Sequence, residues 1–246
     1  MRASITTLSV FAVLLSLTTF ATADLALDDQ NIKLAVEKKI DHKDISNGTG
    51  PWVEVDKGVV TLTGRVKSVW GKNEAVKRAL KVEGVSTVQD ELEIAFGESD
   101  KKVAEAIAQK IRTYAFYTVY DNIEMSINEG HVLLDGRVTM PFKADVIGEL
   151  ASKVMGVQSV TSTIETLPVN IGDDRLRQDI YRRIYGDLMF SSYRNWIDPP
   201  VHIVVERGHV TLTGGVNSNV EKRKAEVIAR TTFGVFSVKN KLAVGS

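Results

Sequence analysis

The chain has 246 residues, 25% of them charged and 43% hydrophobic, with 31 basic and 31 acidic side chains and no cysteine. This composition excludes a collagen-like chain, a disulfide-stapled scaffold and a highly charged disordered chain. It also excludes a thiolate nucleophile, a cysteine-based zinc site and a lipid-modified cysteine anchor. Zero net charge leaves no overall field to steer the whole protein toward nucleic acid or an anionic surface.

The N-terminal segment is typical of a secretory signal peptide. Arg2 supplies a positive charge, an apolar run extends over residues 8–20, and Ala21-Thr22-Ala23 offers the small residues that a signal peptidase reads. The alternative is a membrane anchor, but the run is shorter than the roughly 20 apolar residues that span a bilayer. We expect a signal peptide over residues 1–23, cleavage after Ala23, and a periplasmic protein with no transmembrane span in its mature part. The lack of cysteine does not separate the periplasm from an extracellular space.

The remaining sequence predicts three repeats, over residues 28–95, 99–169 and 173–245. Each contains the motif Gly-x-Val-x-Leu-x-Gly-x-Val and, 20 residues after its second glycine, the motif Gly-Val-x-x-Val. Two motifs at one spacing in three copies indicate a repeated structural unit. The glycines that define them are Gly58, Gly64 and Gly84, then Gly130, Gly136 and Gly156, then Gly208, Gly214 and Gly234.

Within each repeat the residues predict a fixed order of elements. Apolar residues at i, i+4 and i+8 form one stripe of an amphipathic helix, as at Ile32, Val36 and Ile40. Two alternating stretches follow, joined by a short turn that ends in glycine, which predicts a β-hairpin. A second helix with a narrow stripe of small residues and a final alternating strand complete the unit. The matching first-helix stripes are Val103, Ile107 and Ile111, and Leu176, Ile180 and Ile184.

This order predicts an α+β protein of three tandem small αββαβ sandwich domains. Each is expected to be a three-stranded mixed sheet with two helices on one face, because the link from the second strand to the third is long enough for a right-handed crossover. Acidic residues before each first helix are expected to cap it: Asp28, Asp29, Asp100, Asp173 and Asp174. The second-motif glycine is expected to end the second helix. The last glycine of the first motif is expected where the crossover helix approaches the strand.

The two glycine motifs, their spacing and the alternating strand after them resemble the BON domain, in all three copies and over nearly all of the mature chain. The architecture is similar to that of osmotically inducible periplasmic proteins with tandem BON domains. The resemblance implies a non-enzymatic envelope protein that contacts phospholipid membranes and responds to osmotic or envelope stress. The chain departs from familiar relatives by its three copies, by having no lipoprotein cysteine and no lysin-motif module, and by Gly215 at the position of Arg65 and Arg137.

The sequence offers little that could carry catalysis. His131 and His209 follow the turn glycine in two repeats, but no second ligand stands at metal-binding spacing, so we interpret them as exposed turn residues. No Gly-x-Ser-x-Gly elbow, phosphate-binding loop or His-Glu-x-x-His helix is present. We therefore expect no enzyme activity, no cofactor and no metal. The aromatic residues Tyr114, Phe116, Tyr117 and Tyr120 are more simply explained by core filling or by packing between repeats.

Charge is unevenly distributed among the repeats. Residues 28–94 have 11 basic and 12 acidic side chains, residues 99–170 have 7 and 9, and residues 173–244 have 12 and 8. The third repeat also has about five additional residues near Tyr193 to Pro200 and is rich in aromatic residues. Arginine pairs with phosphate, and tryptophan settles at the headgroup level of a bilayer. We hypothesise that this repeat contacts an anionic phospholipid membrane surface through Arg175, Arg177, Arg182, Arg183, Arg194 and Trp196.

Two other functions stay open from the sequence. One is a soluble periplasmic chaperone or protein-interaction module that uses grooves between repeats, with envelope proteins as partners and without lipid. The other is a small-ion sensor, for which no cluster of oxygen ligands is evident. The third-repeat aromatic residues could alternatively bury against a neighbouring repeat. Nucleic acid is not expected as a partner, because the protein is expected to be exported.

Overall fold

The structure is a computed structural model that describes residues 28–95, 97, 99–196 and 198–245. The expected signal peptide over residues 1–23 and its cleavage after Ala23 lie outside the described residues. The chain divides after Ala95 into two compact units. The first repeat belongs to one unit, and the second and third repeats together form the other.

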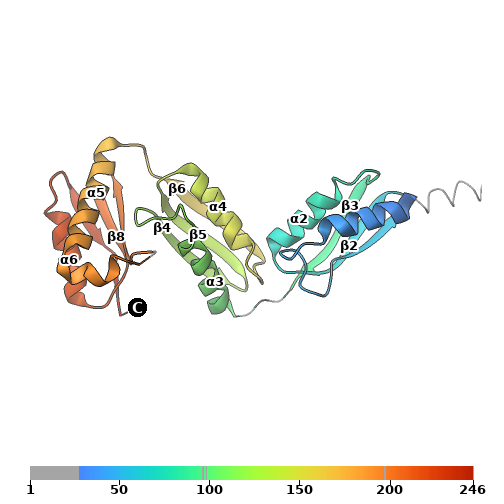
Figure 1. Cartoon of the computed structure of the whole chain (residues 1–246), viewed down its shortest axis with the longest axis horizontal. Coiled ribbons are helices and arrows are strands. Elements are labelled where there is room, and N and C mark those ends of the chain that lie inside the picture. The colour runs from blue at the N-terminus through green and yellow to red at the C-terminus, as the bar shows by residue number, and fades with distance from the viewer. Residues whose placement is uncertain (1–27, 96, 98, 197, 246) are drawn as a thin grey trace, which may run out of the picture. The chain divides into compact units, whose positions relative to one another are not determined.

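The three repeats share one architecture, which confirms the predicted α+β fold (Figure 1). In each, the first strand is antiparallel to the central second strand, and the third strand is parallel to it. The first repeat is helical over residues 28–40 and continues with β1 (Trp52–Asp56), β2 (Val59–Val66), α2 (Val69–Ala79) and β3 (Thr87–Ile94). The second contains α3 (Asp100–Arg112), β4 (Asn122–Asn128), β5 (His131–Val138), α4 (Pro141–Ser152) and β6 (Ser159–Thr166).

The third repeat follows the same plan with two differences. A 3₁₀ helix, η1 (Leu188–Tyr193), is added after the first helix, and the last strand is divided into two short strands that both pair with β8. The additional residues predicted in this repeat therefore form η1 and the loop after it. Its elements are α5 (Ile171–Gly186), η1, β7 (Val201–Glu206), β8 (His209–Val216), α6 (Asn219–Arg230), β9 (Ser237–Asn240) and β10 (Ala243–Val244).

Each core lies between the sheet and its two helices. In the first repeat Val60 and Leu62 of β2 are fully buried, together with Val36 of the first helix. The second helix contributes the predicted small stripe, because Ala75 and Ala79 are also fully buried. Small side chains let the helix axis approach the strands closely, so the narrow stripe has a packing role.

The hairpin turns have the backbone conformation of the type I′ class. Lys57, Glu129 and Arg207 have φ of 49°, 50° and 51°, and the glycine after each also has a positive φ. A type I′ turn needs positive φ at both central residues, and its twist matches that of the flanking strands. Glycine was predicted there, whereas the non-glycine residue before it was not predicted to be left-handed.

An aspartate at the start of each first helix binds this turn through two backbone amides. Asp29 accepts hydrogen bonds from Lys57 N at 2.7 Å and from Gly58 N at 2.9 Å. Asp100 and Asp173 bind the corresponding amides of their own repeats at 2.7 to 2.9 Å. The expectation that these residues cap their own helix is therefore wrong. In α5 the capping residue is Asn170, whose side chain accepts from Gly172 N and Asp173 N.

The two glycine motifs meet at the same end of each repeat. A Cβ atom on Gly58 would lie 2.7 Å from the Gly84 carbonyl oxygen, and one on Gly130 would lie 2.5 Å from that of Gly156. Gly84 has φ of 86° and occupies the third position of a turn closed by the Val85 N to Val82 O hydrogen bond. It does not cap α2, which ends at Ala79, so that expectation is also wrong. The constant spacing of the motifs reflects this contact.

The last glycine of the first motif has a different role from the one expected. It has positive φ in all three repeats, and an added Cβ would collide with the start of the antiparallel neighbouring strand rather than with the crossover helix. The strand order places that segment directly beside it. The glycines are Gly64, Gly136 and Gly214, and the nearest atoms belong to Trp52, Asn122 and Pro200 respectively.

Replacing Asp173 with alanine should destabilise the third repeat. The change leaves the amides of Arg207 and Gly208 without an acceptor, at a cost of about 1–3 kcal/mol for each amide that stays buried. Hydrogen–deuterium exchange at these two amides should be faster in the variant than in the parent, under conditions in which the rest of the repeat stays folded. Asp179→Ala is the matched control, since its exposed pair with Arg182 should be worth about 0–1 kcal/mol.

Two glycines of the second repeat should respond in opposite directions to alanine. Gly130→Ala places a side chain on left-handed backbone, which alone costs about 1–2 kcal/mol. The added methyl group would also collide with the Gly156 carbonyl oxygen. Gly148 lies in α4 with open space around it, so Gly148→Ala should stabilise the repeat by about 0.5–1 kcal/mol. Urea unfolding followed by segment-resolved hydrogen exchange measures both effects. Equal effects of the two changes would contradict the assigned contact.

Candidate functional site

The six side chains predicted to contact lipid do not form one exposed patch. Arg177 is only 4% exposed, and its guanidinium donates to the Val205 carbonyl and pairs with Asp174. It therefore fastens α5 to β7 and cannot reach a membrane without unfolding. The expectation is wrong for this residue because Arg177 lies on the buried face of α5, together with Leu176 and Ile180.

Two further arginines have structural partners. Arg183 donates to the Ile228 carbonyl and to the hydroxyls of Thr231 and Thr232, so it binds the carbonyl end of α6. Arg194 donates to the Tyr185 carbonyl at the end of α5. Arg182 pairs with Asp179 on the helix surface, and Arg175 is exposed near the beginning of α5. Arg183 and Arg194 are exposed too, so Arg177 is the one buried member of the five arginines, although two of the exposed ones are held by main-chain carbonyls.

Most of the aromatic residues near them belong to the core. Tyr185, Phe190 and Tyr193 are buried in the third repeat, and Tyr185 OH donates to the Val201 carbonyl. Burial raises the pKa of Tyr185 far above its ordinary value, which fits a neutral core hydroxyl. Trp196 is 55% exposed and meets Tyr193 edge to face. Three of these side chains are therefore buried, but in the core of their own repeat and not against a neighbouring repeat as the alternative held.

The most exposed aromatic side chains of the third repeat were not predicted. Phe233 is 100% exposed and Phe236 is 78% exposed, on the loop between α6 and β9. The backbone that carries them is held firmly, because Phe236 N donates to the Gly208 carbonyl and Gly234 packs against Leu176. We refer to Phe233, Phe236 and the Arg207-Gly208 turn as the aromatic tip.

The aromatic tip distinguishes the third repeat from the other two. The positions of Phe233 and Phe236, on either side of the second-motif glycine and its valine, correspond to Glu83 and Ser86 in the first repeat. In the second repeat they correspond to Met155 and Gln158, and the chain before α3 lies against Gly156. Aligning the three second motifs reveals this difference, so the signal was present in the sequence.

Cationic side chains accompany the aromatic tip. Arg207 is at the left-handed position of the turn directly beneath Phe236, whose ring also lies 6.0 Å from that of His209. Arg230 is the last residue of α6, three positions before Phe233, and pairs with Glu226. The start of α5, which Asp173 joins to the Arg207-Gly208 turn, adds exposed Ile171 and Arg175, and Val169 before the capping residue is exposed as well.

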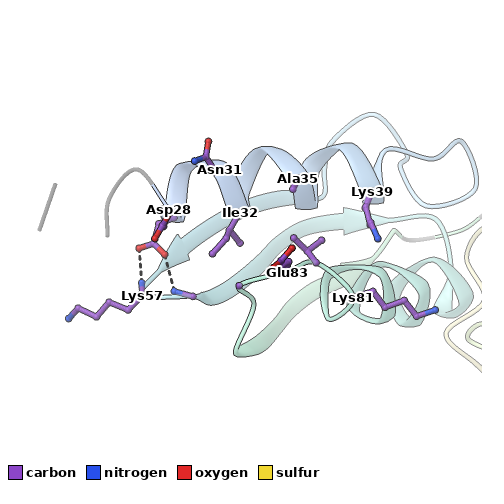
Figure 2. A pocket seen from close by; sticks show the side chains of 12 residues that line it. Asp28, Asn31, Ile32, Ala35, Lys39, Lys57, Lys81 and Glu83 are labelled. Atoms are coloured by element: carbon purple, nitrogen blue, oxygen red, sulfur yellow. Dashed lines mark hydrogen bonds between the residues drawn. The ribbon is translucent and has the colours of Figure 1, made fainter. Parts of the chain in front are cut away.

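The corresponding end of the first repeat is an open hollow of about 850 Å³ (Figure 2). The dashed lines there mark the two hydrogen bonds from the turn to the carboxylate of Asp29. Lys39, Lys57 and Lys81 border the hollow together with Asp28 and Glu83. Charges of both signs line it and no group of polar side chains converges on one point, so we assign it no ligand.

The second and third repeats contact each other within their compact unit. His202 Nδ1 lies 2.6 Å from the Asp121 carbonyl oxygen, and Thr213 Oγ1 donates to Asn122 at 2.6 Å. Ile203 N on the free edge of β7 donates to the Val119 carbonyl. The rings of Tyr120 and Tyr181 also meet at 6.1 Å, as do those of Tyr117 and His202 at 5.5 Å. Packing between repeats therefore accounts for two of the four aromatic residues of the second repeat.

The remaining histidines offer no convergent site in the part of the chain that the structure describes. His131 and His209 are exposed, and each pairs with a serine of the adjacent strand, Ser159 or Ser237. Within the described ranges no group of three potential metal ligands is found. No helix among the described residues is long and apolar enough to cross a membrane.

Comparison with known proteins identifies the repeated unit. Residues 28–95, 99–168 and 173–246 each match the BON domain. The chain belongs to the BON domain family. The BON protein is similar to osmotically-inducible protein Y of Escherichia coli (strain K12), with 32% identity over 148 residues that cover 57% of this chain and 73% of that protein.

The comparison with solved structures also aligns this BON protein with chains of known structure. Two describe CdsD, a structural protein of the type III secretion system of Chlamydia trachomatis, and one of them is its C-terminal domain. They show 16% and 18% identity, cover 85% and 87% of this chain, and account for 95% and 92% of their own chains. Both TM-scores are 0.24, which is too low to establish a common overall structure.

Proposed function

We propose that this BON protein is exported to the periplasm and acts there, without catalysis, in the response to osmotic or envelope stress by contacting an anionic phospholipid surface through its third repeat. The expected signal peptide supports export. The name of the Escherichia coli relative supports a connection with osmotic stress. The observation that carries the membrane contact is the full exposure of Phe233, three residues after Arg230, together with exposed Phe236 over the Arg207-Gly208 turn.

The aromatic tip fits this task better than the arginines first considered. An exposed phenylalanine on a firmly held loop can enter the interface of a bilayer without unfolding its domain, and burial of such a ring is worth up to about 1.5–3 kcal/mol. Each nearby arginine adds about 1 kcal/mol at a charged surface. Arg175 stands near the tip, whereas Arg182 and Trp196 belong to the later part of α5 and the loop after η1.

Replacing Phe233 and Phe236 with serine should reduce binding to vesicles that contain phosphatidylglycerol by about tenfold or more, because the inserted apolar area is lost. Arg207→Asn should reduce it about fivefold, and asparagine tolerates the left-handed backbone at that position. Vesicle co-sedimentation measures both, and rising salt should weaken the binding.

The control for that experiment is the double change Arg182→Gln and Trp196→Ser, which removes exposed residues of the sequence-based hypothesis away from the aromatic tip. We expect this variant to bind vesicles as the parent does. Loss of binding in the control alone would move the contact to the η1 side of the repeat. Absence of binding by the parent protein to any anionic vesicle would contradict the proposal and favour the lipid-independent interaction module.

A further inference from the structure

The outer face of the sheet, which points away from the two helices, is covered at the first strand of the third repeat. The equivalent positions in the first and second repeats are exposed. The outward positions of the first strand are Trp52 and Glu54 in the first repeat, and both are exposed. Glu124 and Ser126 at these positions in the second repeat are exposed as well. In the third repeat they are His202 and Val204, which are 7% exposed each. The segment before β4 covers them, so a histidine is buried at the junction of two repeats.

The partner surface is rigid because a buried carboxylate fixes its backbone. Asp121 is fully buried and accepts five hydrogen bonds, from the amide and hydroxyl of Thr118, from those of Thr139, and from Lys143 Nζ. Its side chain is therefore fully engaged within the second repeat. Its carbonyl oxygen remains for the junction and lies 2.6 Å from His202 Nδ1.

His202 stands between two groups that can only accept hydrogen bonds. A backbone carbonyl lies at Nδ1, and the Asp198 carboxylate lies 3.2 Å from Nε2. A neutral imidazole has one N–H, so it can satisfy only one of these acceptors. When Nδ1 donates to Asp121, the neutral ring presents the Nε2 lone pair to a carboxylate. Only the doubly protonated ring makes both contacts favourable.

We propose that His202 is a proton-dependent clasp that holds the third repeat against the second. With a proton on both nitrogens it links the Asp121 carbonyl to Asp198, which lies in the loop before β7. Loss of the Nε2 proton replaces an ion pair by a repulsive contact and loosens the junction. Only the closed junction offers the doubly protonated ring both acceptors, so we expect acidification to favour closure.

Other charged or titratable groups near His202 lie on α3, on the segment after it, on β4 and between β9 and β10. Tyr117 packs against the imidazole, and burial, followed by the charges of Asp198 and Asp121, raises the pKa of Tyr117 far above its ordinary value, so its hydroxyl stays neutral. Arg112 at the end of α3 lines the adjacent cavity of about 480 Å³, as do Glu124 and Lys241, which pair at 2.9 Å. The cavity borders the imidazole and gives solvent protons a path to it.

The clasp can be tested without any lipid, so its failure would leave the proposed membrane contact untouched. The chain has no cysteine, which allows two fluorophores to be attached at Asp145→Cys on α4 and Arg223→Cys on α6, both exposed. Single-molecule energy transfer in the full-length protein then reports the distance between the two repeats. We expect one narrow population near about pH 5 and a broader distribution near about pH 8.

Two variants separate the clasp from general destabilisation. His202→Gln should give the broad distribution at both pH values. Asp198→Asn should give the narrow one at both, because its amide can donate to the Nε2 lone pair of a neutral ring. His209→Gln, which removes a histidine remote from the junction, should behave as the parent does. A parent distribution that is the same at both pH values, or pH dependence that survives His202→Gln in a protein with native circular dichroism, would overturn the proposal.

Discussion

The fold of each repeat depends on a carboxylate near the start of its first helix that accepts hydrogen bonds from both amides of the hairpin turn. A type I′ turn directs two successive N–H groups to one side, where the start of the first helix lies. The aspartate satisfies both amides and fixes the helix start relative to the hairpin. The turn glycine can then pack against the second-motif glycine. One side chain thereby joins the first helix, the hairpin and the crossover at one end.

Because that end is fixed in the same way three times, its exposed residues can vary without loss of the fold. The first repeat places charges of both signs there, and the second has the chain before α3 lying across Gly156. The third presents two phenylalanines and nearby arginines. The near-zero charge of the whole chain is therefore a sum over unlike repeats. A local membrane contact is compatible with it, whereas steering of the entire molecule is not.

Sequence periodicity predicts the elements, their order and the core, since these depend on local pattern and on one motif spacing. It predicts less well what a polar residue binds. Asp173 has the position of a helix cap, yet its acceptors face a turn 34 residues later. Arg177 looks like a surface cation, yet its partner is a strand carbonyl. Both depend on tertiary approach, which spacing does not encode. Phe233 lies outside the clusters of arginine, and only a comparison of the three aligned second motifs distinguishes it.

The most direct test of this account is to follow the backbone amide signals of the three equivalent ends while anionic lipid nanodiscs are added to the full-length protein. We expect signals of residues 207–208 and 233–236 to broaden first. Residues 57–58 and 83–86 of the first repeat, and 129–130 and 155–158 of the second, should change little. Uniform broadening of all three ends, or broadening centred on residues 188–196, would contradict the claim that one common scaffold presents a membrane contact only at its third copy.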